Sequence, residues 1–420
     1  MQSKPRVLVL GGGFAGLETL FYLRHKLGER VQLTLVSDRG HFLFKPNTIY
    51  IPFGEDPDQY LLDLKKPCVQ KEIEFLLGTA DTVDRFSRRV ALKQGQEVSY
   101  DYLVIATGAA MRPGEIPGLA EHALMPWTPQ QMLELRAGLE RTVAAARQGE
   151  QRRLLFLVPP NNKCSGPLYE LVLMTDTWLR HHQVRDRVQL TFATVEESYI
   201  QSFGPRLNTV VTEEFGERGI EGHTGYAVQR VEPGVVHFQN QATLPYDELI
   251  AFPPYVAAHT FAGLPSDPRG FIKVEPNSRR VLGMEDIYAV GDAANFPIKQ
   301  AYLALLQGDA AGDHIAAAIT GRSPEVLFEP VSMCVMEEMN KATFAQVPLR
   351  YTHDPDKPVA VATDDVEHYK VGVSPLWRLG KKVLGYYLPW RFSHGEPFHA
   401  GFAWSVMDMG LKVMSKLLAK

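Results

Sequence analysis

The sequence predicts an α/β protein with two Rossmann-like, dinucleotide-binding folds and a C-terminal segment that faces a membrane. A G-x-G-x-x-G motif follows a short apolar run at the N-terminus. A second strand–loop–helix–strand pattern begins near residue 154, and the composition changes after about residue 370. The chain has 420 residues, 45% hydrophobic residues and a net charge of -4, which allows two or three domains and argues against disorder and against nucleic-acid binding.

The first predicted strand is the apolar run 6–10, which leads directly into the glycines and then into a helix over about 17–27. Gly11 allows the tight turn, Gly13 lets the backbone approach a diphosphate, and Gly16 lets the helix pack on the strand. The free N–H groups at the helix N-terminus favour the negative charge of the diphosphate. The residues expected to bind it are Gly11, Gly13, Phe14, Ala15 and Gly16.

The second predicted strand, 31–36, ends at an acceptor pair that can bind the adenosine ribose of a dinucleotide. We also expect the downstream Lys45-Pro46 pair at the cofactor. The register of the chain relative to this proline favours Ser37 as the ribose contact. Asp38 is the reserve candidate, and its alternative is a solvated turn residue.

Two further blocks, 100–109 and 286–293, are predicted as buried strands that end in small-residue turns. Together with the N-terminal motif they resemble the two-dinucleotide-fold flavoprotein reductases over most of residues 1–310. The resemblance implies bound FAD, with Asp292 on the ribityl chain and the helix after Lys299-Gln300 directing its positive end at the flavin. The cofactor residues expected here are Ala106, Thr107, Gly108, Gly291, Asp292, Lys299 and Gln300.

The second β-α-β unit has strands at 154–158 and 188–193 around a helix from about Pro167 to Leu179, but its loop lacks the first two glycines. Asn161, Asn162 and Lys163 carry side chains that would crowd a diphosphate, so nicotinamide binding is disfavoured. The same loop holds Cys164, and Cys334 lies far downstream, which favours a donor that reacts with cysteines. Cys68 is expected to be incidental.

The stretches 164–170 and 244–254 resemble the sulfide:quinone oxidoreductases and the related flavocytochrome c sulfide dehydrogenases. The resemblance implies that Cys164 and Cys334 form a redox pair at the flavin, that sulfide leaves a persulfide on one sulfur, and that the thiolate freed on Cys334 reduces the flavin. Two unrelated buried thiols are the alternative. Lys163 is expected to lower the pKa of the attacking thiol. Glu170 is a candidate proton carrier, with a purely structural helix residue as an equal alternative.

The C-terminal segment 370–420 holds eight Lys and Arg against two acids and is rich in aromatics. It suits a monotopic contact with the cytoplasmic side of the cell membrane, while a helix packed on the protein's own core is the alternative. We expect no membrane-spanning helix, because no apolar stretch is long enough, and no cleavable signal peptide, because the first predicted strand starts within a few residues of Met1. We expect one apolar helix face to comprise Trp404, Met407, Leu411, Met414 and Leu418. By resemblance, the quinone candidates are Tyr386, Tyr387, Phe392 and Phe398.

The expected domains are an FAD-binding domain in two parts (1–115 and 265–330), a second Rossmann-like domain (116–264) and a C-terminal domain (331–420). The expected function is oxidation of sulfide to sulfane sulfur with reduction of a membrane quinone; no metal is expected, and a homo-oligomer is allowed. The alternatives are a type II NADH:quinone oxidoreductase and a non-catalytic flavin-binding interaction protein. The sequence leaves open the sulfur product, the quinone and the oligomeric state.

Overall fold

The computed structural model describes residues 4–355 and 357–420. Its first half is built on a parallel five-stranded sheet whose strands are apolar and, except for the edge strand β5, buried on both faces. In sheet order these are β20 (Ile287–Ala289), β9 (Tyr102–Ile105), β1 (Arg6–Leu10), β2 (Gln32–Ser37) and β5 (Glu74–Leu77).

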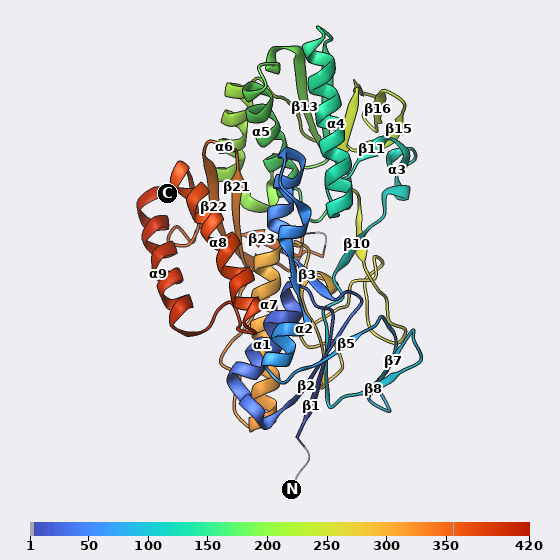
Figure 1. Ribbon diagram of the computed structural model, residues 1–420, viewed down its shortest axis with the longest axis vertical. Coiled ribbons are helices and arrows are strands. Elements are labelled where there is room, and N and C mark those ends of the chain that lie inside the picture. The colour runs from blue at the N-terminus through green and yellow to red at the C-terminus, as the bar shows by residue number, and fades with distance from the viewer. Residues whose placement is uncertain (1–3, 356) are drawn as a thin grey trace.

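Helices α1 (Phe14–Leu27) and α7 (Ala301–Thr320) lie side by side in this half (Figure 1). They approach closely because α7 presents glycines to α1: a Cβ on Gly308 would lie 2.9 Å from the Ala15 carbonyl oxygen. The Thr19 hydroxyl donates across the same contact to the Gly308 carbonyl at 3.2 Å. The approach aligns the N-termini of both helices with the carboxyl ends of the strands, where dinucleotides bind in such sheets.

The second half repeats this plan with another parallel five-stranded sheet, which lies at the top of Figure 1. Its strands in sheet order are β11 (Ala123–Leu124), β18 (Glu248–Ala251), β12 (Arg152–Val158), β13 (Val188–Thr194) and β14 (Glu221–His223). Its helices are α4 (Pro129–Arg147), α5 (Gly166–His181) and α6 (Gly204–Arg218). The antiparallel pair β10 (Ala109–Met111) and β19 (Tyr255–Ala257) connects the two halves. The predicted α/β class with two Rossmann-like folds is confirmed.

Small antiparallel sheets and short helices decorate both halves. They comprise β3 (His41–Leu43), β4 (Leu61–Asp63), α2 (Lys65–Gln70), β6 (Ala80–Asp84), β7 (Arg89–Leu92), β8 (Glu97–Ser99), α3 (Leu119–His122), β15 (Val228–Glu232), β16 (Val235–Phe238) and β17 (Thr243–Pro245). The 3-10 segment η2 (Lys45–Phe53) runs from the first half toward helices α4 and α5 of the second half.

The C-terminal part is an antiparallel sheet followed by two helices. It comprises β21 (Val331–Glu337), β22 (Ala342–Tyr351), β23 (Val359–Val361), β24 (Lys370–Ser374), α8 (Pro375–Ser393) and α9 (Gly401–Leu418). Strand β21 packs against α5, so the C-terminal part is joined directly to the second half.

Helix α9 is apolar on two faces, of which the sequence pattern predicted one. The expected face, from Trp404 to Leu418, is only partly exposed because it packs on the protein. The exposed face consists of Phe402, Val406, Met409, Val413 and Leu417. Helix α8 adds Leu376, Leu379, Val383, Tyr386 and Trp390 at helical spacing. None of the described helices is long and apolar enough to cross a bilayer.

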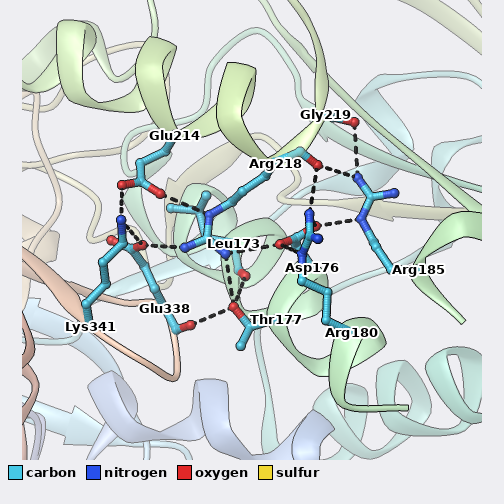
Figure 2. A network of polar contacts seen from close by, with 10 residues as sticks. All are labelled: Leu173, Asp176, Thr177, Arg180, Arg185, Glu214, Arg218, Gly219, Glu338 and Lys341. Atoms are coloured by element: carbon cyan, nitrogen blue, oxygen red, sulfur yellow. Dashed lines mark hydrogen bonds and ion pairs between the residues drawn. The ribbon is translucent and has the colours of Figure 1, made fainter. Parts of the chain in front are cut away.

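A buried ionic network joins α5, α6 and the turn after β21 (Figure 2). The Asp176 carboxylate has no exposed surface and accepts from Arg180 at 2.9 Å and from Arg218 at 3.1 Å, with Arg185 as a third partner. Arg218 also donates to Glu338, the residue that follows β21, at 2.7 Å. This network fixes β21 against the second Rossmann-like fold.

We expect Asp176→Asn to lower the free energy of unfolding by about 3 kcal/mol at pH 7, because guanidinium groups lose a buried partner. Burial alone would raise the pKa of Asp176, but the hydrogen bonds from Arg180 and Arg185 outweigh it and lower that pKa. The carboxylate therefore contributes stability above the unfolded-state pKa of about 4, and loses it as the pH falls through the lower folded-state value. Denaturant unfolding of both proteins should show a gap at pH 7 that narrows below about pH 4; a constant gap would contradict this account.

Candidate functional site

The glycine loop between β1 and α1 lies in a tight cradle with two other turns of the first half. A Cβ on Gly11 would lie 2.3 Å from the Ala106 carbonyl oxygen, and one on Gly16 would lie 2.0 Å from the Gly11 carbonyl oxygen. Gly11 also has φ +110°, a conformation that favours glycine. A Cβ on Gly291 would lie 2.9 Å from that of Ala15. The loop, the turn at residues 106–108 and the Gly291-Asp292 turn therefore converge.

The space in front of this cradle fits FAD. A Cβ on Gly13 would meet nothing within 4 Å, so this glycine leaves room beside the α1 N-terminus where a diphosphate binds. Asp292 lies deep in the protein yet keeps contact with open space, and burial raises the pKa of its carboxyl. The charges of Lys299 and Lys45 oppose this increase, but the carboxylate accepts no hydrogen bond from the described residues, and ribityl hydroxyls would supply its hydrogen bonds.

Ser37 and Asp38 have different surroundings at the end of β2. Ser37 is buried, and its hydroxyl lies 3.1 Å from the Cβ position of Gly12 in the glycine loop. Asp38 is exposed and forms only a 3.6 Å ion pair with the neighbouring Arg39. The geometry favours Ser37 as the ribose contact, in line with the preference from sequence.

Lys299 and Gln300 are used inside the protein. The Lys299 ammonium donates to the Asp292 carbonyl at 3.0 Å and lies over the Phe271 ring, so it supports the Gly291-Asp292 turn from behind. The Gln300 side chain donates to the Met333 carbonyl at 2.7 Å and accepts from the Ser332 hydroxyl at 2.9 Å. Gln300 therefore holds β21 next to Cys334.

The cysteine loop between β12 and α5 is closed by its own side chains. The Asn162 side chain accepts from the Cys164 N–H at 2.9 Å and donates to the Phe252 carbonyl at 3.3 Å. Glu196, beyond the end of β13, accepts from the hydroxyls of Ser165 and Tyr169 at 3.0 and 2.8 Å. An acidic residue in this part of a nicotinamide-binding fold would bind the ribose, but this carboxylate is already satisfied within the protein.

Cys164 and Cys334 are brought together as free thiols, while Cys68 is buried elsewhere. Burial raises the pKa of Cys164, and the adjacent Cys334 raises it further. Burial likewise raises the pKa of Cys334 to about 12, with a further increase from Glu170 that Lys381 partly offsets. Both sulfurs are therefore protonated thiols at neutral pH in this arrangement.

The expectation that Lys163 lowers the pKa of the attacking thiol is wrong, because Lys163 is not among the charges that shift the pKa of Cys164 or of Cys334. The charged neighbours of Lys163 are Asp267, Arg269 and Lys299. The cation that lowers the pKa of Cys164 is Lys45 from η2, which sequence distance gave no reason to choose.

Glu170 lies beside Cys334. Its buried carboxylate pairs with Lys381 of α8 and accepts from the Glu337 N–H at 2.6 Å. Burial raises the pKa of Glu170, and the Lys381 ammonium opposes that increase. The Glu337 carboxylate in turn accepts from Tyr50 at 2.8 Å and from Arg378 at 2.7 Å. Carboxylates and donors therefore form a connected polar path from Cys334 toward α8, which sequence analysis did not find.

This path ends at a cleft of about 580 Å³ between η2 and α8, within the usual size of a small-molecule site. Tyr50, Arg378, Tyr386 and Trp390 are among its lining residues. Of the four expected quinone residues, the structure places only Tyr386 in this lining. The other three are buried by aromatic packing: Tyr387 against Phe398, and Phe392 against Phe21 and Phe42.

Comparison with known proteins identifies the family. Residues 5–149 and 184–308 match the pyridine nucleotide-disulphide oxidoreductase family. The chain belongs to this family. The family's flavoprotein fold and the fit of the cradle together make FAD its cofactor.

Individual relatives refine the comparison. A sulfide-quinone reductase of Aquifex aeolicus is 30% identical over 239 residues, which cover 56% of this chain and 54% of that protein. This chain therefore matches about half the length of that relative. An internal alternative NAD(P)H-ubiquinone oxidoreductase of Solanum tuberosum is 26% identical over 70% of this chain and 63% of that protein. The crystal structure of the sulfide:quinone oxidoreductase from Aquifex aeolicus has the same fold, with a TM-score of 0.83, 22% identity, and coverage of 97% of this chain and 96% of that one.

A Cβ on Gly11 or Gly16 would clash with the backbone, whereas one on Gly13 would meet no protein atom. A substitution of Gly13 therefore tests cofactor binding without disturbing the fold. We expect Gly13→Ala to fold normally but to lose FAD, because its Cβ enters only the space of the diphosphate. Flavin absorbance per protein should fall at least about tenfold while far-UV circular dichroism is unchanged. Gly216→Ala in α6, whose Cβ also meets nothing within 4 Å, is the control and should keep its flavin; full flavin content in Gly13→Ala would contradict the assignment.

Proposed function

We propose that this protein oxidises sulfide to sulfane sulfur and transfers the electrons to a membrane quinone. The observation that carries the proposal is the closed loop of the second fold, which puts Cys164 beside Cys334 in place of a nicotinamide site. The names of the Aquifex relative and of its solved counterpart support the same activity.

In this proposal the two cysteines alternate between a disulfide and the free thiols. Sulfide attacks the disulfide, one sulfur keeps a persulfide, and the freed thiolate is the reductant. When bound, FAD accepts two electrons on the cysteine side and gives them up to the quinone. Glu170 and Lys381 hold or release a proton beside Cys334, since their pair is buried and hydrogen-bonded there.

A nicotinamide-dependent quinone reductase is the second candidate, because the Solanum relative carries that name. Two features disfavour it. Asn162 uses the loop N–H of Cys164 that a diphosphate would need, and the carboxylate of Glu196 is satisfied by Ser165 and Tyr169.

We propose the cleft between η2 and α8 as the quinone site. Its aromatic lining includes Tyr386 and Trp390, which also belong to the exposed apolar face of α8. A lipid-soluble acceptor can therefore enter from a bilayer that covers this face. Phe44 in the cleft wall contacts Phe14 of the glycine loop, with ring centroids 6.1 Å apart, so the cleft adjoins the FAD cradle.

The exposed apolar faces of α8 and α9 form the proposed membrane surface, for a monotopic contact on the cytoplasmic side. The two helices lie side by side, with Met414 of α9 3.7 Å from the Cβ position of Gly380 in α8 (Figure 1). Exposed lysines, among them Lys382, Lys412 and Lys416, flank the apolar residues and can meet anionic headgroups.

Replacing either redox cysteine tests the activity. Cys164→Ser and Cys334→Ser should each lower the rate of sulfide-dependent decylquinone reduction by about 10³-fold or more, because no disulfide can form. Cys68→Ser is the matched control, since this thiol is fully buried away from the pair, and it should keep the parent rate. Turnover at the parent rate in a Cys334→Ser enzyme would refute the redox pair.

Acidic substitutions on the exposed apolar face of α9 test the proposed membrane surface. Phe402→Asp combined with Met409→Asp should lower partition into anionic liposomes at least about tenfold, because two exposed apolar anchors become acidic. Phe86→Asp is a matched control, because Phe86 is 86% exposed and Phe402 is 85% exposed. Unchanged sedimentation of the double variant with liposomes would show that another surface makes the contact.

A further inference from the structure

Three side chains near Cys164 have no role in the proposed sulfur chemistry: Trp127, Tyr255 and Lys45, the last of which the sequence predicts at the cofactor. Tyr255 begins β19, and its N–H donates to the Asn161 carbonyl at 3.0 Å. This bond, and the one from Asn162 to the Phe252 carbonyl, attach the start of β19 to the cysteine loop. The Tyr255 ring is thereby fixed relative to the Cys164 sulfur.

Trp127 holds the other two side chains together. The Lys45 ammonium lies over the face of the Trp127 ring, a favourable cation–π arrangement. The Tyr255 ring meets the same indole edge to face, with centroids 5.5 Å apart and an interplanar angle of 79°. One aromatic side chain therefore contacts both the Lys45 ammonium and the Tyr255 ring.

Both polar ends lack a protein partner. Tyr255 is 2% exposed, and its hydroxyl makes no hydrogen bond to any residue in the described part of the chain. This hydroxyl is not among the fully enclosed unpaired atoms, so it reaches open space and is able to donate to a group that is not part of the protein. The Lys45 ammonium likewise has no hydrogen bond or ion pair within residues 4–355 and 357–420. Cys164 is among the nearest ionisable neighbours of both.

We propose that Lys45 and Tyr255 are a donor pair that stabilises negative charge on the sulfur carried by Cys164, as a thiolate and as a persulfide. The persulfide part rests on the proposed function; the thiolate part does not. The pair supplies two donors to a sulfur that is otherwise surrounded by apolar or acidic groups.

The covalent step balances with these groups. HS⁻ attacks Sγ of Cys164, the bond to Sγ of Cys334 breaks, and its electron pair stays on Cys334 as a thiolate. Cys164 then carries S–SH, whose proton passes to neutral Lys45. The persulfide anion accepts hydrogen bonds from the Lys45 ammonium and the Tyr255 hydroxyl. Burial lowers the pKa of Lys45 to about 7, so both of its protonation states are present near neutral pH.

The other ionisable groups near the Cys164 sulfur act on its pKa in the direction opposite to Lys45. Cys334, Asp292 and Glu196 raise the pKa of Cys164, whereas Lys45 lowers it. The neighbours of Lys45 are Asp292, Arg39 and Cys164. Removing Lys45 therefore leaves Cys164 with only neighbours that raise its pKa, so the loss of the lysine charge should appear as a higher pKa of this thiol.

The test uses the full-length, FAD-bound protein with Cys334→Ser, so that Cys164 is the single thiol of the site. The rate of iodoacetamide alkylation of the Cys164 peptide is followed by mass spectrometry from pH 6 to 10, with flavin content recorded for each variant. Adding Lys45→Met should slow alkylation about tenfold at pH 8 and move the profile up by about one pH unit. Tyr255→Phe should slow it about threefold, and Lys45→Arg should restore most of the rate.

Lys163→Met is the matched control, because it removes the lysine that precedes Cys164 in sequence but whose charge does not shift the pKa of that thiol. It should leave the profile unchanged. Superimposable profiles for the parent, Lys45→Met and Tyr255→Phe would overturn the proposal, as would an equal loss in Lys163→Met. Should Lys45→Met lose its flavin, the Tyr255→Phe and Lys45→Arg profiles decide in the same way. Failure of the proposed function would appear separately, as a parent enzyme that sulfide does not bleach.

Discussion

The contact between α5 and β21 is the constraint on which the site depends, because it brings together two cysteines 170 positions apart in sequence. Asp176, Arg218 and Glu338 fix this contact from one side through buried ion pairs. Gln300 fixes it from the FAD half through its hydrogen bonds to β21. The thiols therefore meet only when all three parts of the chain are folded.

Burial governs the chemistry of the pair. It raises the pKa of both thiols, so an anionic sulfur exists only where the protein supplies donors or cations. The two sulfurs differ in this respect. Cys334 is served by the Glu170–Lys381 pair, which connects it to the cleft at α8, and Cys164 is served by Lys45. Separate surroundings suit separate roles in one reaction.

Much of the fold followed from the sequence, because each motif is local. The glycine loop, the turn at residue 106 and the Gly291-Asp292 turn each combine a buried strand with small residues, and the two-fold architecture and FAD binding are confirmed. The pairing of Cys164 with Cys334 came from resemblance alone, since the separation of two cysteines in sequence does not give their distance in space. The domain limits and the individual site residues stay predictions.

The features that could not be predicted from the sequence are tertiary contacts. Lys45 is distant in sequence from Cys164 yet lowers its pKa, whereas the charge of the adjacent Lys163 has no such effect. Tyr255 directly follows the stretch 244–254 that carries the resemblance, yet nothing in that stretch indicated that a tyrosine near Cys164 comes next. The pattern predicted one of the two apolar faces of α9, and periodicity cannot tell which of two apolar faces is packed on the protein.

Anaerobic stopped-flow mixing of the flavin-loaded protein with sulfide, and separately with NADH, tests the central claim most directly. We expect sulfide to bleach the oxidised flavin band within the time of one turnover, a short-chain quinone to restore it, and NADH to leave it unchanged. Bleaching by NADH with no response to sulfide would show that the closed cysteine loop still admits a nicotinamide, and the account of the site given above would be wrong.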